Sequence, residues 1–258
     1  MITEEFGKAL YGTILLSKHR IHNPHICKRP EVIDVERYLK NKETFSEKDQ
    51  ERLARSRVCV VGCGGLGGYV IEMLGRLGVG WITVIDGDQF DATNLNRQIL
   101  SHTRNAGMSK AIGAKERMAL VNPEVHIDPV NTFLNKDNGE SLLKHHDVIV
   151  DALDNIDARL MLQDFAESLG IPMVFGGIGG WFGQVSTIFP GDRTLQKVYA
   201  QGSQRVEKKL GTPSFTPATV SSIQTSEVVK LLLNRGEILR KKILFVDLLE
   251  QSFLVFDL

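Results

Sequence analysis

The stretch "CVVGCGGLGG", Cys59–Gly68, decides the fold of this chain. An apolar run typical of a buried strand breaks into five glycines within seven residues, and a helical pattern follows. Gly62, Gly64 and Gly67 satisfy the G-x-G-x-x-G pattern, whose glycines let backbone N–H groups and a helix N-terminus approach a phosphate. A Gly-rich packing turn without a ligand is the alternative, but every glycine costs stability relative to alanine. The stretch therefore predicts a nucleotide site.

The segments on either side of this turn alternate between strand and helix patterns. The expected parallel strands are 57–62, 81–86, 125–131, 147–153 and 172–178. The helices expected between them are 68–79, 109–123 and 158–170. These strands are near-continuous apolar runs, as in a parallel sheet that is covered on both faces. Residues 183–189 and 243–258 indicate additional, antiparallel strands, with a helix at 221–236 between them. The order predicts an α/β fold with a doubly wound, mostly parallel sheet.

The composition argues against several classes of function. The 258 residues include 31 Lys+Arg and 31 Asp+Glu, so the chain lacks the basic excess of a nucleic-acid-binding protein. Glu4, Glu5 and Lys8 interrupt any apolar run at the N-terminus, so no signal peptide is expected. The uncharged stretch 168–191 is rich in glycine and contains proline, which disfavours a membrane-spanning helix. The three cysteines form no disulfide framework, and a cytoplasmic, reducing location is expected.

Residues 1–34 differ from the rest and are interpreted as an N-terminal arm before a domain at 35–258. The arm is locally basic and contains three of the seven histidines. Four potential metal ligands lie close together there: His19, His22, His25 and Cys27. No second cluster completes a closed metal site, so a solvated or partner-binding arm is favoured.

The domain opens with a helical pattern over 35–53 that has a break near Thr44. Ser46 followed by Asp49 resembles a capping box, with Asp in place of the usual Glu or Gln. A helix is therefore expected to begin just after Ser46.

Polar and charged residues cluster where the second and fourth strands end. Asp86 closes the second strand nineteen residues after Gly67, where an acid would bind ribose hydroxyls. The other members are Asp88, Asn94, Arg97, Gln98, Lys110, Asp154 and Asn155. In a doubly wound sheet these positions gather at the carboxyl edge of the strands, around one crevice. Two cations with a carboxylate suit a triphosphate with magnesium, whereas a nicotinamide site has no need for that cluster.

In these motifs the chain resembles the ThiF/MoeB/HesA activating enzymes, which are related to the ubiquitin-activating adenylation domain. The matching motifs, in the family's order over 35–258, are "SRVCVVGCGGLGG", "LGVGWITVIDGD", "NLNRQIL", "GMSKAIGAKERM", "NPEV", "DVIVDALDN" and "GQVSTIFPG". The resemblance implies a Rossmann-like nucleotide-binding sheet, usually a homodimer. It also implies adenylation of the C-terminal glycine carboxylate of a small ubiquitin-like carrier protein or peptide, with ATP and Mg²⁺.

The resemblance assigns roles to individual residues of the site. It places Gly65 at the phosphate turn and Asp86 on the ribose, Asn94, Arg97 and Lys110 around the phosphates, and Asp154 with Asn155 at magnesium and phosphate. Arg97, Lys110 and Mg²⁺ would stabilise the charge that develops on the phosphoryl oxygens and on the leaving pyrophosphate. The alternative for each charged residue is a surface ion pair.

The chain also departs from the family pattern. Many members hold zinc with two C-x-x-C pairs, but residues 190–199 and 243–258 contain no cysteine, so no structural zinc is expected. No cysteine follows Cys63, which argues against a thioester step within this chain. Cys59 is expected in the core. Cys63 is expected in the phosphate turn, where packing is the favoured role and where its side chain would face the nucleotide rather than the carrier tail.

A further departure lies near the start of the domain. Many relatives read Arg-Tyr-x-Arg there, and the second arginine reaches ATP in the partner subunit. This chain has Arg37, Tyr38, Leu39 and Lys40. Lysine keeps the charge but loses the guanidinium fork, so the role passes to Lys40 only weakly, with Arg37 as the alternative.

Other functions stay open at this point. A nicotinamide or flavin oxidoreductase would need a hydride-transfer site, and no such constellation is visible. A non-catalytic nucleotide- or carrier-binding protein would have no use for intact Arg97, Lys110 and Asp154. A relative that activates a carboxylate on a modified tRNA base fits the motifs; the neutral net charge weakens this alternative but does not exclude it. The sequence names neither the carrier, the pathway (thiamine, molybdopterin, cysteine or peptide modification) nor the final nucleophile.

Overall fold

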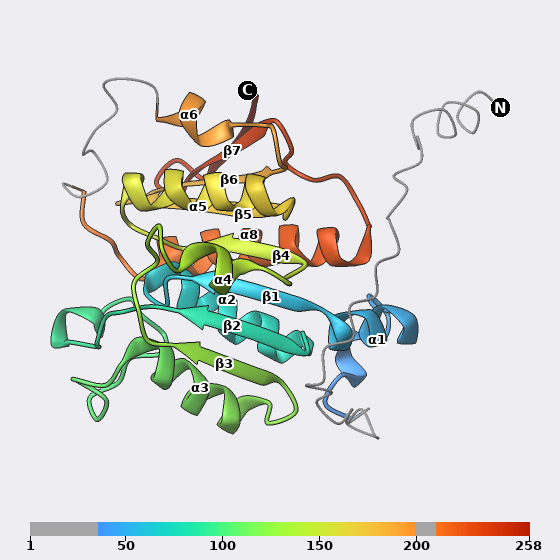
Figure 1. Cartoon of the computed structure of the whole chain (residues 1–258), viewed down its shortest axis with the longest axis vertical. Helices are drawn as coiled ribbons and strands as arrows, with labels where there is room; N and C mark the ends of the chain where they lie inside the picture. Colours follow the sequence, from blue (N-terminus) through green and yellow to red (C-terminus); the bar gives the residue numbers. More distant parts are fainter. Residues whose placement is uncertain (1–35, 200–209) are drawn as a thin grey trace. The chain divides into compact units, whose positions relative to one another are not determined.

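The computed structural model describes residues 36–199 and 210–258, which belong to one compact unit, Val35–Leu258. The N-terminal arm, with its potential metal ligands, lies outside the described residues. Within them, eight strands form one sheet in the order β3-β2-β1-β4-β5-β6-β7-β8 (Figure 1). The strands are β1 Arg57–Val61, β2 Trp81–Ile85, β3 His126–Val130, β4 Val148–Asp151, β5 Met173–Gly179, β6 Phe182–Ile188, β7 Lys242–Asp247 and β8 Ser252–Asp257.

The direction of the strands confirms the predicted fold class. Strands β1 to β5 pair in parallel, and β6, β7 and β8 extend the sheet through antiparallel pairs. At the centre of the sheet, Val58 of β1 lies opposite Ile82 of β2 on one side and Val148 of β4 on the other. The strand order therefore reverses beside β1, and the crevice at such a switch point is where ligands bind in open α/β sheets.

Helices cover both faces of the sheet. The described helices are α1 Glu47–Arg55, α2 Gly65–Leu77, α3 Lys110–Val121, α4 Gly139–Leu143, α5 Ile156–Leu169, α6 Thr194–Val198 and α8 Phe215–Leu233, with 3₁₀ turns at Leu39–Asn41 (η1) and Ala92–Asn94 (η2). Figure 1 shows α5 in front of the sheet and α8 behind it. Helices α1, α2, α3 and α8 share one apolar core with the sheet, and α4, α5 and α6 share the other.

The alternation of side chains along β1 explains why the chain needs both layers. Val58 and Val60 pack into the core with α2 and α8, whereas Cys59 and Val61 pack into the core with α5. All four side chains are essentially buried. A strand buried on both faces must be apolar at consecutive positions, which is why this run lacks a polar alternation.

Helices α2 and α8 begin earlier than the sequence predicts, whereas the start of α1 agrees with the prediction. The helical pattern at 35–53 becomes the turn η1 and then α1, separated near Thr44 as expected. The predicted capping box of α1 is confirmed, because Ser46 Oγ accepts from the Asp49 N–H at 3.2 Å and the Asp49 carboxylate accepts from the Ser46 N–H at 2.9 Å. Helix α2 begins at Gly65 rather than Gly68, so the last glycines of the motif form its first turn.

Helix α8 begins six residues earlier than expected, at Phe215 rather than residue 221. Pro217 therefore lies in the first turn of this helix. Proline is tolerated in the first turn of a helix because the N–H groups of that turn have no intrahelical acceptor. None of the helices in the described ranges is long and apolar enough to cross a membrane.

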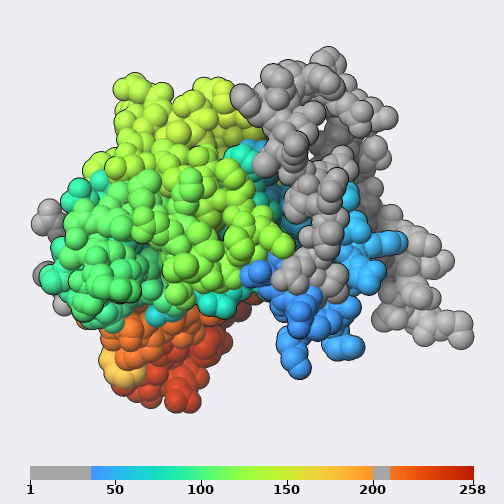
Figure 2. Space-filling view, turned by 90° about the horizontal axis from the view of Figure 1, so that it is seen from below, coloured from blue at the N-terminus to red at the C-terminus, as the bar shows by residue number. Residues whose placement is uncertain are grey.

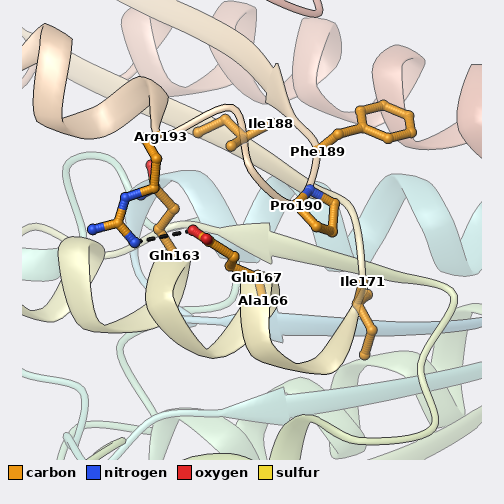
Figure 3. A pocket seen from close by; sticks show the side chains of 8 residues that line it. All are labelled: Gln163, Ala166, Glu167, Ile171, Ile188, Phe189, Pro190 and Arg193. Atoms are coloured by element: carbon orange, nitrogen blue, oxygen red, sulfur yellow. Dashed lines mark hydrogen bonds and ion pairs between the residues drawn. The ribbon is translucent and has the colours of Figure 1, made fainter.

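A small hollow lies between α5 and the loop that follows β6, and Figure 3 shows the side chains that line it. Arg193 on its rim donates to Glu167 at 3.0 Å and to Asp164 at 2.9 Å. Ile171 precedes β5 and Ile188 ends the antiparallel β6, so the hollow lies at the amino end of β5. It is therefore on the opposite edge of the sheet from the residues that the sequence predicts for the nucleotide.

Candidate nucleotide-binding site

The glycines of the first turn serve two different purposes. Gly62 has a φ of +97°, and a Cβ there would lie 2.5 Å from the carbonyl oxygen of Ala152. A Cβ at Gly67 would lie 1.7 Å from the carbonyl oxygen of Gly62. These two glycines are required by the packing of α2 against the ends of β1 and β4. A Cβ at Gly64 or Gly65 would meet nothing closer than 3.6 Å, so packing does not explain those two.

The N-terminus of α2 is open to a ligand. Gly64 is its N-cap and supplies no side-chain hydrogen bond to the first turn. The first N–H groups of a helix have no intrahelical acceptor, and together with the helix dipole they favour an anion. Gly64 and Gly65 place no side chain of their own in front of these groups, and the nearest side-chain atoms, of Gln98 and Pro217, lie 3.6 Å from the position of a Cβ.

Asp86 fixes the glycine turn to the end of β2. Its Oδ2 accepts from the backbone N–H of Cys63 at 2.7 Å, and its Oδ1 accepts from the N–H of Asp88 at 2.8 Å. Burial raises the pKa of Asp86, and the two backbone hydrogen bonds oppose that rise. The sequence indicated only a ribose contact for this acid, and the turn-holding role adds to that prediction.

Lys110 and Asp88 form an ion pair beside the turn. Lys110 Nζ lies 3.0 Å from Asp88 Oδ2, and the Lys110 backbone N–H donates to the Asp88 carbonyl oxygen at 3.0 Å. The Lys110 side chain is only 10% exposed, whereas that of Asp88 is 56% exposed. Asp88 therefore positions the lysine in this structure, and its predicted contact with the nucleotide stays a prediction.

The segment "NLNRQ" lies over the glycine turn. The side chain of Arg97 passes 3.9 Å from a Cβ built on Gly65, and that of Gln98 passes 3.6 Å from one built on Gly64. Arg97 donates from Nη1 to the carbonyl oxygen of Thr93 at 2.9 Å and to Oδ1 of Asn96 at 2.8 Å, so both bonds use the same nitrogen of its guanidinium. Gln98 is buried, and its Oε1 has no hydrogen-bond partner among the described residues.

Asn94 is placed differently from its neighbours in this segment. It is buried, and its Oδ1 accepts from the N–H of Asp91 at 3.1 Å within the cap of η2. Its side chain therefore shapes the loop that carries Arg97, and a direct phosphate contact stays a prediction. Asn96, two residues on, donates to the carbonyl oxygen of Thr212 at 3.2 Å. Figure 2 shows the corresponding surfaces of the middle of the chain (green) and of the C-terminal region (orange and red) side by side.

Asp154 and Asn155 follow β4 at the same edge of the sheet, next to Ala152, which contacts Gly62. Both are exposed. Asn155 Oδ1 accepts from the N–H of Ala158 at 3.1 Å and so caps α5, a role that sequence reasoning did not assign. No group of three or more His, Cys, Asp or Glu side chains gathers to hold a metal within residues 36–199 and 210–258.

Lys40 is not brought to this site by its own chain. It lies in η1 and is exposed. The neighbouring Arg37 donates to the carbonyl oxygen of Val121 at 2.7 Å, and Val121 ends α3, whereas Lys110 begins it. Both basic residues of "ERYLKN" thus lie at the other edge of the sheet, and a contact of Lys40 with nucleotide would need a partner subunit.

The favoured packing role of Cys63 is confirmed, whereas the expectation that its side chain faces the nucleotide is wrong. Its thiol is fully buried in the core below the turn, and burial raises its pKa well above the ordinary value. Only its backbone N–H takes part in the site, through Asp86. The expected core position of Cys59 is confirmed, and burial raises its pKa as well.

Three buried polar residues beneath the site were missed: Asp151, Arg159 and Gln224. Gln224 of α8 donates to the carbonyl oxygen of Asp151 at 2.9 Å, and Arg159 reaches the β4–α5 connection. The available signal was a charged residue at the end of an apolar strand, followed eight residues later by an arginine within an apolar helix pattern.

Comparison with known proteins identifies the family. The sequence model of the ThiF family matches residues 36–258. The chain belongs to the ThiF family. It is 36% identical over 208 residues to the SAMP-activating enzyme E1 of Haloferax volcanii, a match that covers 79% of this chain and 77% of the relative. It is also 36% identical over 214 residues to the sulfur carrier protein adenylyltransferase of Thermus thermophilus, with 79% of each chain covered.

Solved structures agree on the fold of this ThiF family member. The crystal structure of Escherichia coli MccB with MccA-N7isoASN superposes with a TM-score of 0.75, 21% identity and coverage of 88% of this chain and 72% of that one. At that identity the likeness concerns the fold alone.

An ion pair joins the loop after β6 to the segment before β7. Asp192 in that loop pairs with Arg240, with Oδ2 3.0 Å from Nε and Oδ1 3.2 Å from Nη2. The Arg240 guanidinium also lies 4.6 Å from the centre of the Phe189 ring.

Proposed function

We propose that this protein is an ATP-dependent adenylyltransferase that activates the C-terminal carboxylate of a small ubiquitin-like carrier protein or peptide. Membership of the ThiF family and the named adenylyltransferase relatives support this activity. The observation that carries the proposal is that two cations, Lys110 and Arg97, lie beside the glycine turn. Packing requires Gly62 and Gly67 in this turn but does not require glycine at 64 and 65. An oxidoreductase would not need these cations.

The chemistry follows from that arrangement. A carboxylate oxygen of the substrate attacks the α-phosphorus of ATP, a new P–O bond forms, and the bond to the β-phosphate oxygen breaks, which releases pyrophosphate. Negative charge increases on the phosphoryl oxygens and on the leaving group. Lys110, whose side chain is only 10% exposed, and Arg97 supply positive charge at fixed positions. Their interaction with the phosphoryl oxygens and with the leaving group therefore strengthens in the transition state. No protein nucleophile takes part in this half-reaction.

Magnesium fits the site through one carboxylate. Mg²⁺ keeps several waters and binds to one or two carboxylates together with substrate phosphates, so it needs no cage of protein ligands. Asp154 is exposed at the carboxyl edge and makes no hydrogen bond or ion pair within the described part of the chain, which suits this role. The ion would neutralise phosphate charge.

The proposal also covers the partners of the protein. The carrier would present a C-terminal glycine, as the resemblance to the activating enzymes implies. A homodimer would let Lys40 of one subunit serve the nucleotide of the other. The two described cysteines are buried free thiols, which supports a cytoplasmic, reducing location and a mechanism in which an outside sulfur donor or amine consumes the acyl-adenylate.

Isotope exchange between pyrophosphate and ATP tests the proposal. The purified protein should exchange label only when ATP, Mg²⁺ and a carrier ending in Gly-Gly are all present. A carrier with its last glycine removed is the matched control and should give background exchange. Exchange that depends on tRNA instead of a carrier protein would favour a tRNA-modifying activity. Binding of NAD without binding of ATP would favour the alternative function, an oxidoreductase.

A further inference from the structure

Two buried charged residues flank the connection that carries Asp154. Asp151 is the last residue of β4 and is fully buried, and Arg159 lies in the first turns of α5 with 2% of its surface exposed. Asp154 lies between them on the exposed connection. The nucleotide site described above assigns no contact with nucleotide to either buried residue.

The two side chains hold opposite sides of one residue, Leu153. Asp151 Oδ1 accepts from the Leu153 N–H at 3.0 Å. Arg159 donates to the Leu153 carbonyl oxygen twice, from Nε at 3.0 Å and from Nη2 at 2.6 Å. Arg159 Nε also lies 4.0 Å from Asp151 Oδ2. The backbone N–H and the carbonyl oxygen of Leu153, the residue before Asp154, are therefore both held by buried side chains.

The guanidinium of Arg159 is itself anchored in the core. Its Nη2 reaches the carbonyl oxygen of Gly176 in β5 at 3.3 Å, its Nη1 donates to the hydroxyl of Tyr199, and its carbon lies 5.2 Å from the centre of the Phe175 ring. On the other side of the sheet, Gln224 holds the carbonyl oxygen of Asp151. Rotation of Arg159 away from Leu153 would break all of these contacts, so the held geometry is rigid.

Stability alone is a poor explanation for this pair. Removing two charges from water is costly, and well-packed apolar residues often replace a buried ion pair without loss of stability. What the pair supplies instead is a defined backbone position for an otherwise exposed connection. Chemistry at a phosphate is sensitive to displacements of about 1 Å in the groups around it, so such a position has functional value.

The geometry points to Arg159 as a positioning residue for the adenylation reaction. By holding the Leu153 carbonyl oxygen, it sets the backbone from which the Asp154 carboxylate reaches magnesium and phosphate. This inference rests on the proposed function, in which Asp154 makes that contact.

The test compares Arg159→Lys with Arg193→Lys in the full chain. Lysine at 159 keeps the charge but cannot donate from two nitrogens to one carbonyl oxygen. The variant should fold, and its ATP affinity without Mg²⁺ should be within about twofold of wild type. The increase in ATP affinity that Mg²⁺ causes should fall by about tenfold or more. The kcat for pyrophosphate exchange should fall by a similar factor. Arg193 is 49% exposed and pairs with Asp164 and Glu167 of α5, the helix that carries Arg159, so Arg193→Lys should match wild type.

A double-mutant cycle separates positioning from a general loss of structure. In an Asp154→Ala background, Arg159→Lys should add no more than about a twofold loss, because the group that it positions is absent. An equal loss in both backgrounds, or an unchanged Mg²⁺ dependence of ATP affinity in the single variant, would overturn the inference. Because ATP affinity needs no carrier, this result is independent of whether exchange is observed.

Hydrogen exchange in the wild-type protein covers the case in which Arg159→Lys does not fold. The Leu153 N–H should exchange as slowly as the amides of β4, although it lies outside the strand. Exchange at the rate of an unprotected peptide would show that the connection is not held and would contradict the positioning role.

Discussion

Lys110 Nζ lies 3.0 Å from Asp88 Oδ2, and this pair joins the first residue of α3 to the loop that follows β2. The lysine is largely buried while its partner is half-exposed, so the ammonium has a fixed position at the edge of the glycine turn. The side chain of Arg97 lies beside Gly65 of that turn. The two cations therefore come to the turn from two separate segments of the chain.

Removal of either cation should abolish most of the activity without unfolding the protein. We expect Lys110→Ala and Arg97→Ala to lower carrier-dependent pyrophosphate exchange by about 10²–10³-fold, because both groups stabilise charge that develops in the transition state. Lys115→Ala, an exposed lysine of the same helix, is the matched control and should leave exchange unchanged. Near-normal exchange in Lys110→Ala or Arg97→Ala would remove these residues from the catalytic site.

The glycines of the turn should separate by mutation into two groups. Gly67→Ala places a Cβ 1.7 Å from the Gly62 carbonyl oxygen and should cost about 3 kcal/mol or more of unfolding free energy. Gly65→Ala meets only ordinary contacts, so it should keep the thermal unfolding midpoint while weakening ATP binding through the new methyl group. Calorimetric titration and thermal unfolding of both variants check this, and normal ATP affinity in Gly65→Ala would place the phosphates elsewhere.

The strand pattern and the glycine turn could be predicted from sequence because local rules determine them. The apolar run at β1 and the start of a helix after it depend on neighbouring residues, and the capping box of Ser46 and Asp49 lies within four positions. The early start of α8 was not predicted, and its first turn accommodates Pro217 because proline is tolerated at that position.

The buried polar groups beneath the site could not be predicted in the same way. Arg159 contacts Leu153, six residues away, but also Gly176 and Tyr199, and that set of contacts exists only once β5 and α6 are in place. The direction of the Cys63 side chain likewise depends on how tightly α2 packs against β1.

The buried thiols predict an enzyme without a covalent carrier intermediate on Cys59 or Cys63. Burial raises both pKa values, so neither thiol forms the nucleophilic thiolate at neutral pH. Under native conditions iodoacetamide should label at most Cys27, which lies outside the described residues, whereas denaturant should expose all three cysteines. Intact mass spectrometry counts the labelled cysteines under native and under denaturing conditions. Rapid labelling of Cys63 under native conditions would show that the turn opens.

Stability should depend on pH through Glu72 of α2. Its carboxylate is 6% exposed and accepts from Arg117 of α3, at 2.9 Å to each oxygen, and from Arg76. Burial alone would raise the pKa of Glu72, but the arginine hydrogen bonds outweigh burial and lower it from the ordinary value of 4.5. Its contribution is therefore present above pH 4.5 and is lost as the pH falls through the lowered pKa.

The corresponding variant is Glu72→Gln. It should lose about 2 kcal/mol of unfolding free energy at pH 7, and its difference from wild type should shrink below pH 4.5. Glu51→Gln removes an exposed pair with Arg55 and should cost less than about 0.5 kcal/mol at any pH. Chemical unfolding from pH 3 to pH 8 measures both, and a pH-independent loss in Glu72→Gln would contradict the linkage.

The most direct test of the proposed activity is pyrophosphate exchange with the purified wild-type protein and a carrier co-purified from its native cell. The account predicts that label enters ATP only with Mg²⁺ and a carrier whose terminal glycine is intact, and that Lys110→Ala abolishes it. Binding of ATP with no exchange in the presence of that carrier would contradict the account and leave a protein that binds nucleotide without activating a carboxylate.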